Sequence, residues 1–233
     1  MKALVSHSGG VDSTTCLAMA IEKYGAENVS TVSFIYGQKL VKELESADKL
    51  AKHYKVNHYV LDLSEAFRFS DCALLKGSDK AIVHESYETQ METKGDNAIT
   101  SYVPFRNGLF LSAVSCVALS IYPGEDVTVY IGAQANDSVN NTYADCSVEF
   151  VGAMDKAIRL GTYGKVRLTA PIVGMSKAQV IAAGLKLKVP YELTWTCYEG
   201  GQKPCGKCAA CIDRIAAFKT NGKDDPVEYM KAN

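Results

Sequence analysis

Residues 2–24, KALVSHSGGVDSTTCLAMAIEKY, decide the fold of this chain. The apolar run at residues 2–6 predicts a buried strand, and the pattern at residues 13–24 predicts a helix. The glycine loop Ser8-Gly9-Gly10-Val11-Asp12-Ser13 lies between them. A strand that passes through such a loop into a helix is typical of the crossover units that build parallel sheets.

Apolar runs and helical patterns alternate along the rest of the chain. We expect strands over residues 29–36, 58–63 and 127–132, and helices over residues 40–54 and 105–121. A capping-box pattern at Ser176 and Gln179 predicts a further helix, and a closing helix is expected near residues 211–218. This order predicts an α/β fold, with a Rossmann-like parallel sheet and helices on both faces. Its ligands should bind beyond the carboxyl ends of the strands, where the strand order reverses.

Residues 64–102 interrupt the alternation. They are polar and too long for an ordinary connection, so we expect a lid or an insertion that contacts a partner. We assign residues 1–190 to the α/β domain with this insertion. Residues 191–233 are assigned to a small C-terminal region with clustered cysteines and the closing helix.

The glycine loop has the groups that an anion site needs. Glycines let backbone N–H groups approach an anion, and the following helix adds the positive end of its dipole. Hydroxyls of Ser8, Ser13 and Thr14 lie beside the loop in the sequence. The alternative is a plain strand-to-helix turn with Ser13 as the N-cap. The chain contains neither the G-x-x-x-x-G-K-[ST] phosphate loop nor the G-x-G-x-x-G dinucleotide fingerprint, which disfavours kinase-like and dehydrogenase-like proteins.

Four cysteines, Cys197, Cys205, Cys208 and Cys211, lie within 15 residues of sequence. Their spacing suits one tetrahedral ion, and zinc is favoured. A ferredoxin-like iron–sulfur site is the alternative, but the C-x₃-C-P continuation is missing. A site closed by four cysteines is structural, since it leaves no open position for water. Nearby Lys203, Lys207 and Arg214 either offset the charge of the site or are solvated surface charges.

The composition is that of a folded globular protein, with 47% hydrophobic and 22% charged residues among 233. A formal net charge of −1 gives no general attraction to nucleic acid, so no nucleic-acid partner is expected. The longest apolar stretch, residues 109–122, contains three serines and is shorter than the ~20 residues of a membrane span. The N-terminus leaves no room for a signal peptide before the loop, and the clustered cysteines suit a reducing compartment. We therefore expect a cytoplasmic protein without a membrane partner.

The hexapeptide at residues 8–13 resembles the SGGxDS signature of the PP-loop ATP pyrophosphatases, which cleave ATP to AMP and pyrophosphate. The resemblance implies that the loop holds the departing pyrophosphate and that Mg²⁺ accompanies ATP. It implies an ATP-binding set of Ser8, Gly9, Gly10, Val11, Asp12, Ser13 and Thr14. Asp12 would bind Mg²⁺ or orient the loop. Since the loop has no lysine, Arg106 is a candidate for neutralising phosphate charge, and it joins Ser8, Asp12 and Ser13 as a candidate catalytic residue.

Three further stretches resemble the 7-cyano-7-deazaguanine synthase family of queuosine biosynthesis: YVPFRNG at residues 102–108, TWTCYEGG at 194–201 and PCGKCAAC at 204–211. The resemblance covers residues 8–218. It implies a C–N ligase and homodimer whose substrates are 7-carboxy-7-deazaguanine, ammonium and ATP. The carboxylate would be adenylated and converted to an amide, and the amide adenylated again and converted to the nitrile.

Four residues are candidates for substrate contacts. Arg106 and Asn107 suit a phosphate or a carboxylate, or else only begin a helix. Asp137 and Asp145 suit the guanine-like edge of the base, or else are exposed turn aspartates. Residues 143–150, YADCSVEF, depart from the YPDCRPEF-like stretch of the family. This leaves open a different 7-substituted deazapurine or a reaction that stops at the amide.

Two other functions compete with this one. PP-loop enzymes that modify tRNA carry similar loops, but the near-neutral chain lacks an obvious basic arm for a large phosphate contact. A zinc-knuckle module that binds nucleic acid or protein is the alternative outside enzymes.

Overall fold

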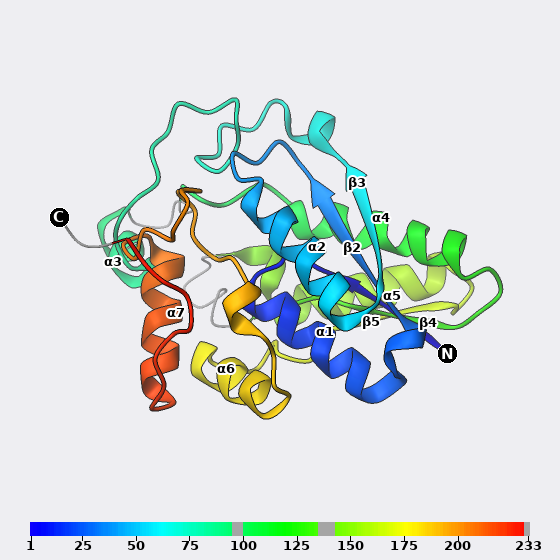
Figure 1. Cartoon of the computed structure of the whole chain (residues 1–233). Coiled ribbons are helices and arrows are strands. Elements are labelled where there is room, and N and C mark those ends of the chain that lie inside the picture. The colour runs from blue at the N-terminus through cyan, green and yellow to red at the C-terminus, as the bar shows by residue number, and fades with distance from the viewer. Residues whose placement is uncertain (95–99, 135–142, 231–233) are drawn as a thin grey trace.

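In the residues that the structure describes, five parallel strands form one sheet (Figure 1). A computed structural model of the chain describes residues 1–94, 100–134 and 143–230. The strands are β1 (Lys2–Ser6), β2 (Val29–Ile35), β3 (Asn57–Asp62), β4 (Val127–Tyr130) and β5 (Val166–Thr169). They lie in the order β3-β2-β1-β4-β5, and each neighbouring pair is parallel. The predicted α/β fold is confirmed.

Helices cover both faces of the sheet, as Figure 1 shows. The helices are α1 (Val11–Tyr24), α2 (Lys42–Tyr54), α3 (Tyr87–Lys94), α4 (Arg106–Ile121), α5 (Val148–Gly161), α6 (Lys177–Lys186) and α7 (Ala209–Thr220). Successive residues of β1 point to opposite faces, so Leu4 packs in the core with α4 and α5, and Ala3 and Val5 pack in the core with α1, α6 and α7. Each described helix is too short or too polar to span a bilayer.

The strand order reverses beside β1. The chain leaves β1 toward β2 and β3, and it later returns to the other side of β1 to form β4 and β5. In open parallel sheets the crevice at such a reversal is where ligands bind. The glycine loop directly follows β1 and therefore lies at this crevice.

Several elements differ from the sequence prediction. The helices α3 and α5 and the strand β5 were not predicted. Helix α1 begins at Val11 instead of residue 13, and α7 begins at Ala209 instead of residue 211. The fifth strand has only four residues at the edge of the sheet, which gives little periodicity to detect.

The segment at residues 64–102 is packed onto the sheet in its described part. Phe67, Cys72, Leu74 and Leu75 are buried in the core that contains α4. The backbone also pairs, since Lys39 N donates a hydrogen bond to Leu74 O over 2.8 Å. The segment is therefore integral to the domain, and its action as a lid stays a prediction.

A buried ion pair ties the C-terminal region together. The Arg214 side chain is 2% exposed, and its Nε and Nη2 donate to the two carboxylate oxygens of Asp225 over 2.7 and 2.9 Å. Arg214 also donates to Thr194 Oγ1 and Tyr191 O. The interpretation of Arg214 as a solvated surface charge is therefore wrong, because its side chain is buried and paired with Asp225. Lys203, by contrast, pairs with exposed Glu228 at 2.7 Å.

We expect Arg214→Met to lower the free energy of unfolding by about 3–5 kcal/mol, because Asp225 would remain buried and unpaired. Urea denaturation measures this change. Arg159→Met is the control: Arg159 and Asp155 lie 3.8 Å apart at the surface, and its loss should be below about 1 kcal/mol. Equal losses in the two variants would contradict the prediction.

Candidate active site

A pocket of about 230 Å³ opens at the carboxyl ends of β1, β2 and β4. The glycine loop forms its floor, and the first turns of α2 and α4 form part of its wall. Leu74, Tyr87 and Ser101 from the segment at residues 64–102 line it, as do Trp195, Thr196 and Tyr198 before the cysteines. The pocket thus joins stretches that are far apart in the sequence, at the edge of the sheet where the ligand site was predicted.

Glycine is required at two positions around the loop. Gly9 has a positive φ of 81°, and a β-carbon there would overlap the backbone oxygen of Glu43 and lie 2.7 Å from Ala47 N. Gly132, which follows β4, would place a β-carbon 2.9 Å from Ser13 N. The loop therefore packs tightly between α2 and the residue after β4, and this packing fixes the position of its backbone.

The loop hydroxyls hydrogen-bond to the loop itself. Ser13 Oγ accepts from Ser8 N and lies 3.1 Å from Ser8 Oγ, and Thr14 Oγ1 donates to Gly10 O over 2.6 Å. Gly10 is the N-cap of α1, so the interpretation of Ser13 as a simple N-cap is wrong. Since Gly10 has no side chain, no capping group covers the first N–H groups of α1, and that end of the helix suits an anion.

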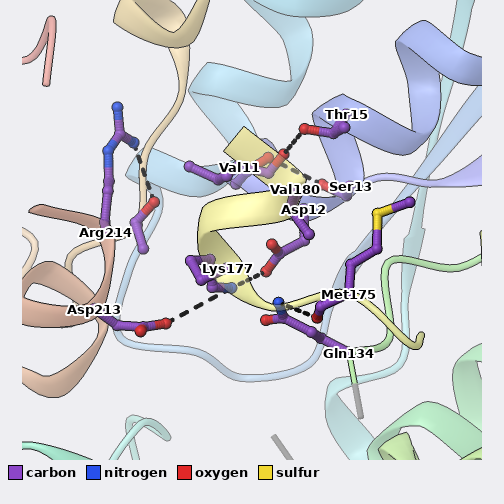
Figure 2. A network of polar contacts seen from close by, with 12 residues as sticks. Val11, Asp12, Ser13, Thr15, Gln134, Met175, Lys177, Val180, Asp213 and Arg214 are labelled. Carbon is purple, nitrogen blue, oxygen red and sulfur yellow. Dashed lines mark hydrogen bonds and ion pairs between the residues drawn. The ribbon is translucent and has the colours of Figure 1, made fainter. Parts of the chain in front are cut away.

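Lys177 is the functional candidate that sequence reasoning missed. It is the first residue of α6, and its Nζ lies 2.6 Å from Asp12 Oδ2 and 4.0 Å from Asp213 Oδ2 (Figure 2). The capping box at Ser176 and Gln179 is confirmed, and it fixes the start of α6 beside the loop. Lys177 supplies the positive charge that the hexapeptide lacks, from 165 residues away.

Asp12 retains one oxygen suited to a cation. Its Oδ2 is paired with Lys177, while its Oδ1 is buried and has no hydrogen-bond partner among the described residues. Asp213 adds a second carboxylate on the other side of Lys177, and burial raises the pKa of Asp213 above its ordinary value, against the effect of Lys177. Carboxylate oxygens are the protein ligands that Mg²⁺ prefers, so Asp12 fits the ion that the resemblance implies.

His7 lies under the loop as a neutral side chain. It is 1% exposed, and its Nε2 lies 3.2 Å from Thr14 Oγ1. Burial, together with the neighbouring His58, lowers the pKa of His7 to about 3. At neutral pH His7 therefore carries no charge, and it cannot balance the charge of a phosphate.

The start of α4 places Arg106 and Asn107 at the pocket. Arg106 lies over the rings of Tyr36 and Phe110, at 5.6 and 6.0 Å from their centroids. Asn107 N donates to Asp145 Oδ2 over 2.9 Å, and Asn107 Nδ2 donates to Asp145 O over 3.1 Å. Asp145 is buried rather than an exposed turn aspartate, and it anchors the start of α4. Asp137 lies outside the described residues.

The departure from the family pattern falls at the start of α5. Ser147 is the N-cap of this helix and accepts a hydrogen bond from Phe150 N over 3.1 Å. Val148 is then the first helical residue, the position where proline is favoured. The start of α5 is therefore kept although two prolines and the arginine of the family pattern are absent, because Ser147 supplies the cap.

The four clustered cysteines come together as predicted. The Sγ atoms of Cys197, Cys205, Cys208 and Cys211 all lie within 4.8 Å of one another, and all four residues are buried. Sulfurs around one tetrahedral zinc lie roughly 3.8 Å apart. Cys197 Sγ and Cys205 Sγ each accept two backbone N–H hydrogen bonds over 3.2–3.4 Å. A donor set of this chemistry and geometry fits zinc.

The cysteine cluster is joined to the glycine loop. Trp195 N donates to Gly9 O over 2.9 Å, and Trp195 Nε1 donates to Cys197 O over 2.9 Å. Asp213, two residues after Cys211, reaches Lys177. The cluster therefore supports one wall of the pocket.

Known proteins resemble this chain over nearly all of its length. Residues 2–222 match the family model described as "Queuosine biosynthesis protein QueC". A 7-cyano-7-deazaguanine synthase of Caldicellulosiruptor saccharolyticus is 42% identical over 98% of this chain and 96% of its own. The protein of that name from Archaeoglobus fulgidus is 39% identical over 97% and 90%, and that from a Marinomonas species is 39% identical over 98% of each chain.

Proposed function

Since the chain belongs to the QueC family of queuosine biosynthesis proteins, we propose that it converts 7-carboxy-7-deazaguanine and ammonia to 7-cyano-7-deazaguanine with cleavage of ATP. The observation that carries the proposal is the uncapped start of α1 beside Lys177, at the strand-order reversal of a parallel sheet. This arrangement suits a polyphosphate, and each adenylation releases one.

The glycine loop would hold the pyrophosphate that leaves ATP. Backbone N–H groups at the start of α1 and the hydroxyls of Ser8 and Ser13 would donate hydrogen bonds to it, and Lys177 would balance its negative charge. Asp12 would hold Mg²⁺, which stabilises the charge of the phosphates when it is bound. The ATP-binding set is then Ser8 to Thr14, as the sequence predicts, with Lys177 added.

The substrate carboxylate would lie between the loop and α4. Arg106 is fixed over two aromatic rings with its guanidinium at the pocket, where it suits a carboxylate or the α-phosphate. Asn107 has its side-chain amide on Asp145 O, so it orients Arg106 through the start of α4. Contacts of Asp137 and Asp145 with the base stay predictions.

The enzyme must keep water away from two activated intermediates. Hydroxide leaves poorly from a carboxylate and oxide from an amide, so adenylation makes AMP the leaving group each time. Attack of water would release AMP and return the carboxylate or the amide, so that the ATP would be consumed without product. Tyr87 and Ser101 of the segment at residues 64–102 line the pocket and would exclude water from it. A structural zinc on the four cysteines would hold the adjoining wall, where Tyr198 Oη lies 2.6 Å from Tyr87 Oη. The homodimer and the cytoplasmic location stay predictions.

The direct test incubates the purified chain with Mg-ATP, ammonium and 7-carboxy-7-deazaguanine, and follows AMP, ADP and the mass of the base together. We expect AMP and the mass of the nitrile. AMP with a product that stays at the amide would place the divergence at residues 143–150. No turnover of the free base, with AMP formed on addition of tRNA, would favour a tRNA-modifying enzyme and contradict the proposal.

A further inference from the structure

Glu43 is a pocket carboxylate that neither the fold nor the ATP site accounts for. It lies in the first turn of α2 and lines the pocket, and its backbone oxygen packs against Gly9 of the loop. Its carboxylate makes no hydrogen bond or ion pair with any other residue that the structure describes. The other acidic residues of the pocket, Asp12 and Asp213, both face Lys177.

The surroundings of Glu43 weaken its acidity. The charged and titratable groups that act on it are Arg106 from the start of α4 and Tyr36 after β2. Burial raises the pKa of Glu43 to about 7, although Arg106 opposes the change, and burial raises the pKa of Tyr36 to about 12. Near neutral pH a carboxyl group of this kind both accepts and returns a proton, as a general base must.

The proposed reaction needs such a group several times. The nitrogen of ammonium loses two protons on its way to the amide: one before it attacks the acyl adenylate, and one after the C–N bond forms and the C–O bond to AMP breaks. The amide nitrogen then loses its last two. One leaves as the amide oxygen attacks the α-phosphorus and displaces pyrophosphate. The other leaves as AMP departs with the C–O electron pair and the nitrile forms. No oxidant or reductant takes part.

Among the described residues of the pocket, the other groups that could accept protons are Asp12 and Asp213, which both face the positive charge of Lys177, and His7, which is unsuited to the task. Its Nε2 is engaged with Thr14, and its lowered pKa makes the neutral ring a weak base. The histidines His53, His58 and His84 do not line the pocket. Glu43 is therefore left as the proton acceptor within reach of the loop.

We propose that Glu43 is a catalytic residue, the general base that takes protons from ammonium and from the amide nitrogen and passes them to solvent. This inference rests on the proposed function. It adds to that function a residue that the motifs of the sequence do not single out, and it assigns the proton transfers.

The test starts from the 7-carboxamide of 7-deazaguanine with Mg-ATP and no ammonium, so that the titration of ammonia does not enter. In the wild-type chain the rate of nitrile formation should rise with pH through an apparent pKa near 7, because the carboxylate must be deprotonated to act. Glu43→Gln should lower the rate at about pH 8 by roughly 10²–10⁴-fold and abolish this pH dependence. Glu43→Asp should recover part of the rate together with a pH dependence.

Glu45→Gln is the matched control. Glu45 lies two residues along the same helical turn, is about half exposed, and pairs with Lys42 at 3.5 Å, so its loss should leave the rate unchanged. A merely structural role of Glu43 would lower thermal stability and leave the pH dependence in place. A Glu43→Gln chain that keeps both rate and pH dependence overturns the inference while the proposed function stands. A wild-type chain that makes nitrile from neither the carboxylate nor the amide overturns both.

Discussion

Lys177→Met should lower the rate of AMP formation by about 10²–10³-fold, the loss typical when one preorganised donor that stabilises developing negative charge is removed from an active site. The ammonium group lies 2.6 Å from Asp12 at the start of α1, and the glycine loop contains no lysine of its own. Methionine keeps much of the stem but leaves Asp12 to repel the phosphates. We therefore expect kcat/KM for ATP to fall with kcat, because the charge develops as pyrophosphate leaves.

The control for Lys177 lies on the same helix. Lys186→Met removes an exposed lysine in the last turn of α6 and should leave the rate of AMP formation unchanged. Both variants are followed by AMP and pyrophosphate release over a range of ATP concentrations, with thermal unfolding measured in parallel. If Lys177→Met lowers the melting temperature but keeps kcat/KM for ATP within about twofold, Lys177 only ties α6 to α1, and its proposed catalytic role is wrong.

The loop and the cysteine cluster were predictable because each is a local pattern. In the first, a strand end, two glycines and a helix start are contiguous, and in the second the spacing alone brings four sulfurs around one ion. Neither prediction needs knowledge of which helices pack together. The same holds for the order of strands and helices from β1 to β4 apart from α3, since the periodicity of the other elements is long enough to detect.

Lys177 and Glu43 could not be placed from the sequence because their positions depend on tertiary packing. Lys177 reaches the loop because α6 packs beside α1, and Glu43 reaches it because α2 packs against Gly9. The residues of the Lys177–Asp12 pair are 165 apart in the sequence. One signal was present: Lys177 follows the N-cap Ser176, and a lysine at a helix N-terminus opposes the helix dipole. Such a local conflict indicates that an anion lies nearby.

Asp145, by contrast, was named from the sequence, but its observed contact differs from the one suggested. Its place in a stretch that resembles the family suggested a contact with the base, yet its Oδ2 accepts from Asn107 N at the start of α4. The sequence could not reveal this bond, since the two residues are 38 apart and belong to different elements. Helix α5 was missed beside it, although Val151, Met154 and Ile158 recur at helical spacing and pack in the core.

Loss of the metal from the cysteine cluster should unfold the C-terminal wall of the pocket. The wild-type chain should carry about one zinc, and Cys205→Ser should lose it, along with much of the roughly 10–16 kcal/mol that structural zinc contributes to small folds. Apolar packing cannot replace the ion, since the cluster core consists of the four cysteines, Trp195 and Ala210. Metal analysis, thermal unfolding and limited proteolysis at the exposed Lys203 measure the change.

Loss of the metal should also weaken the binding of ATP. Trp195 N donates to Gly9 O, and α7 carries Asp213 to Lys177, so a disordered cluster frees both the loop and the lysine. We expect the Kd for ATP to rise in Cys205→Ser and to stay unchanged in Cys116→Ser, which alters an exposed cysteine of α4 outside the cluster. A visible charge-transfer band in the wild-type chain would show iron and sulfide in place of zinc. Unchanged stability and ATP binding in Cys205→Ser, with the zinc lost, would contradict the prediction, because the hydrogen bond from Trp195 to the loop would then persist without a metal.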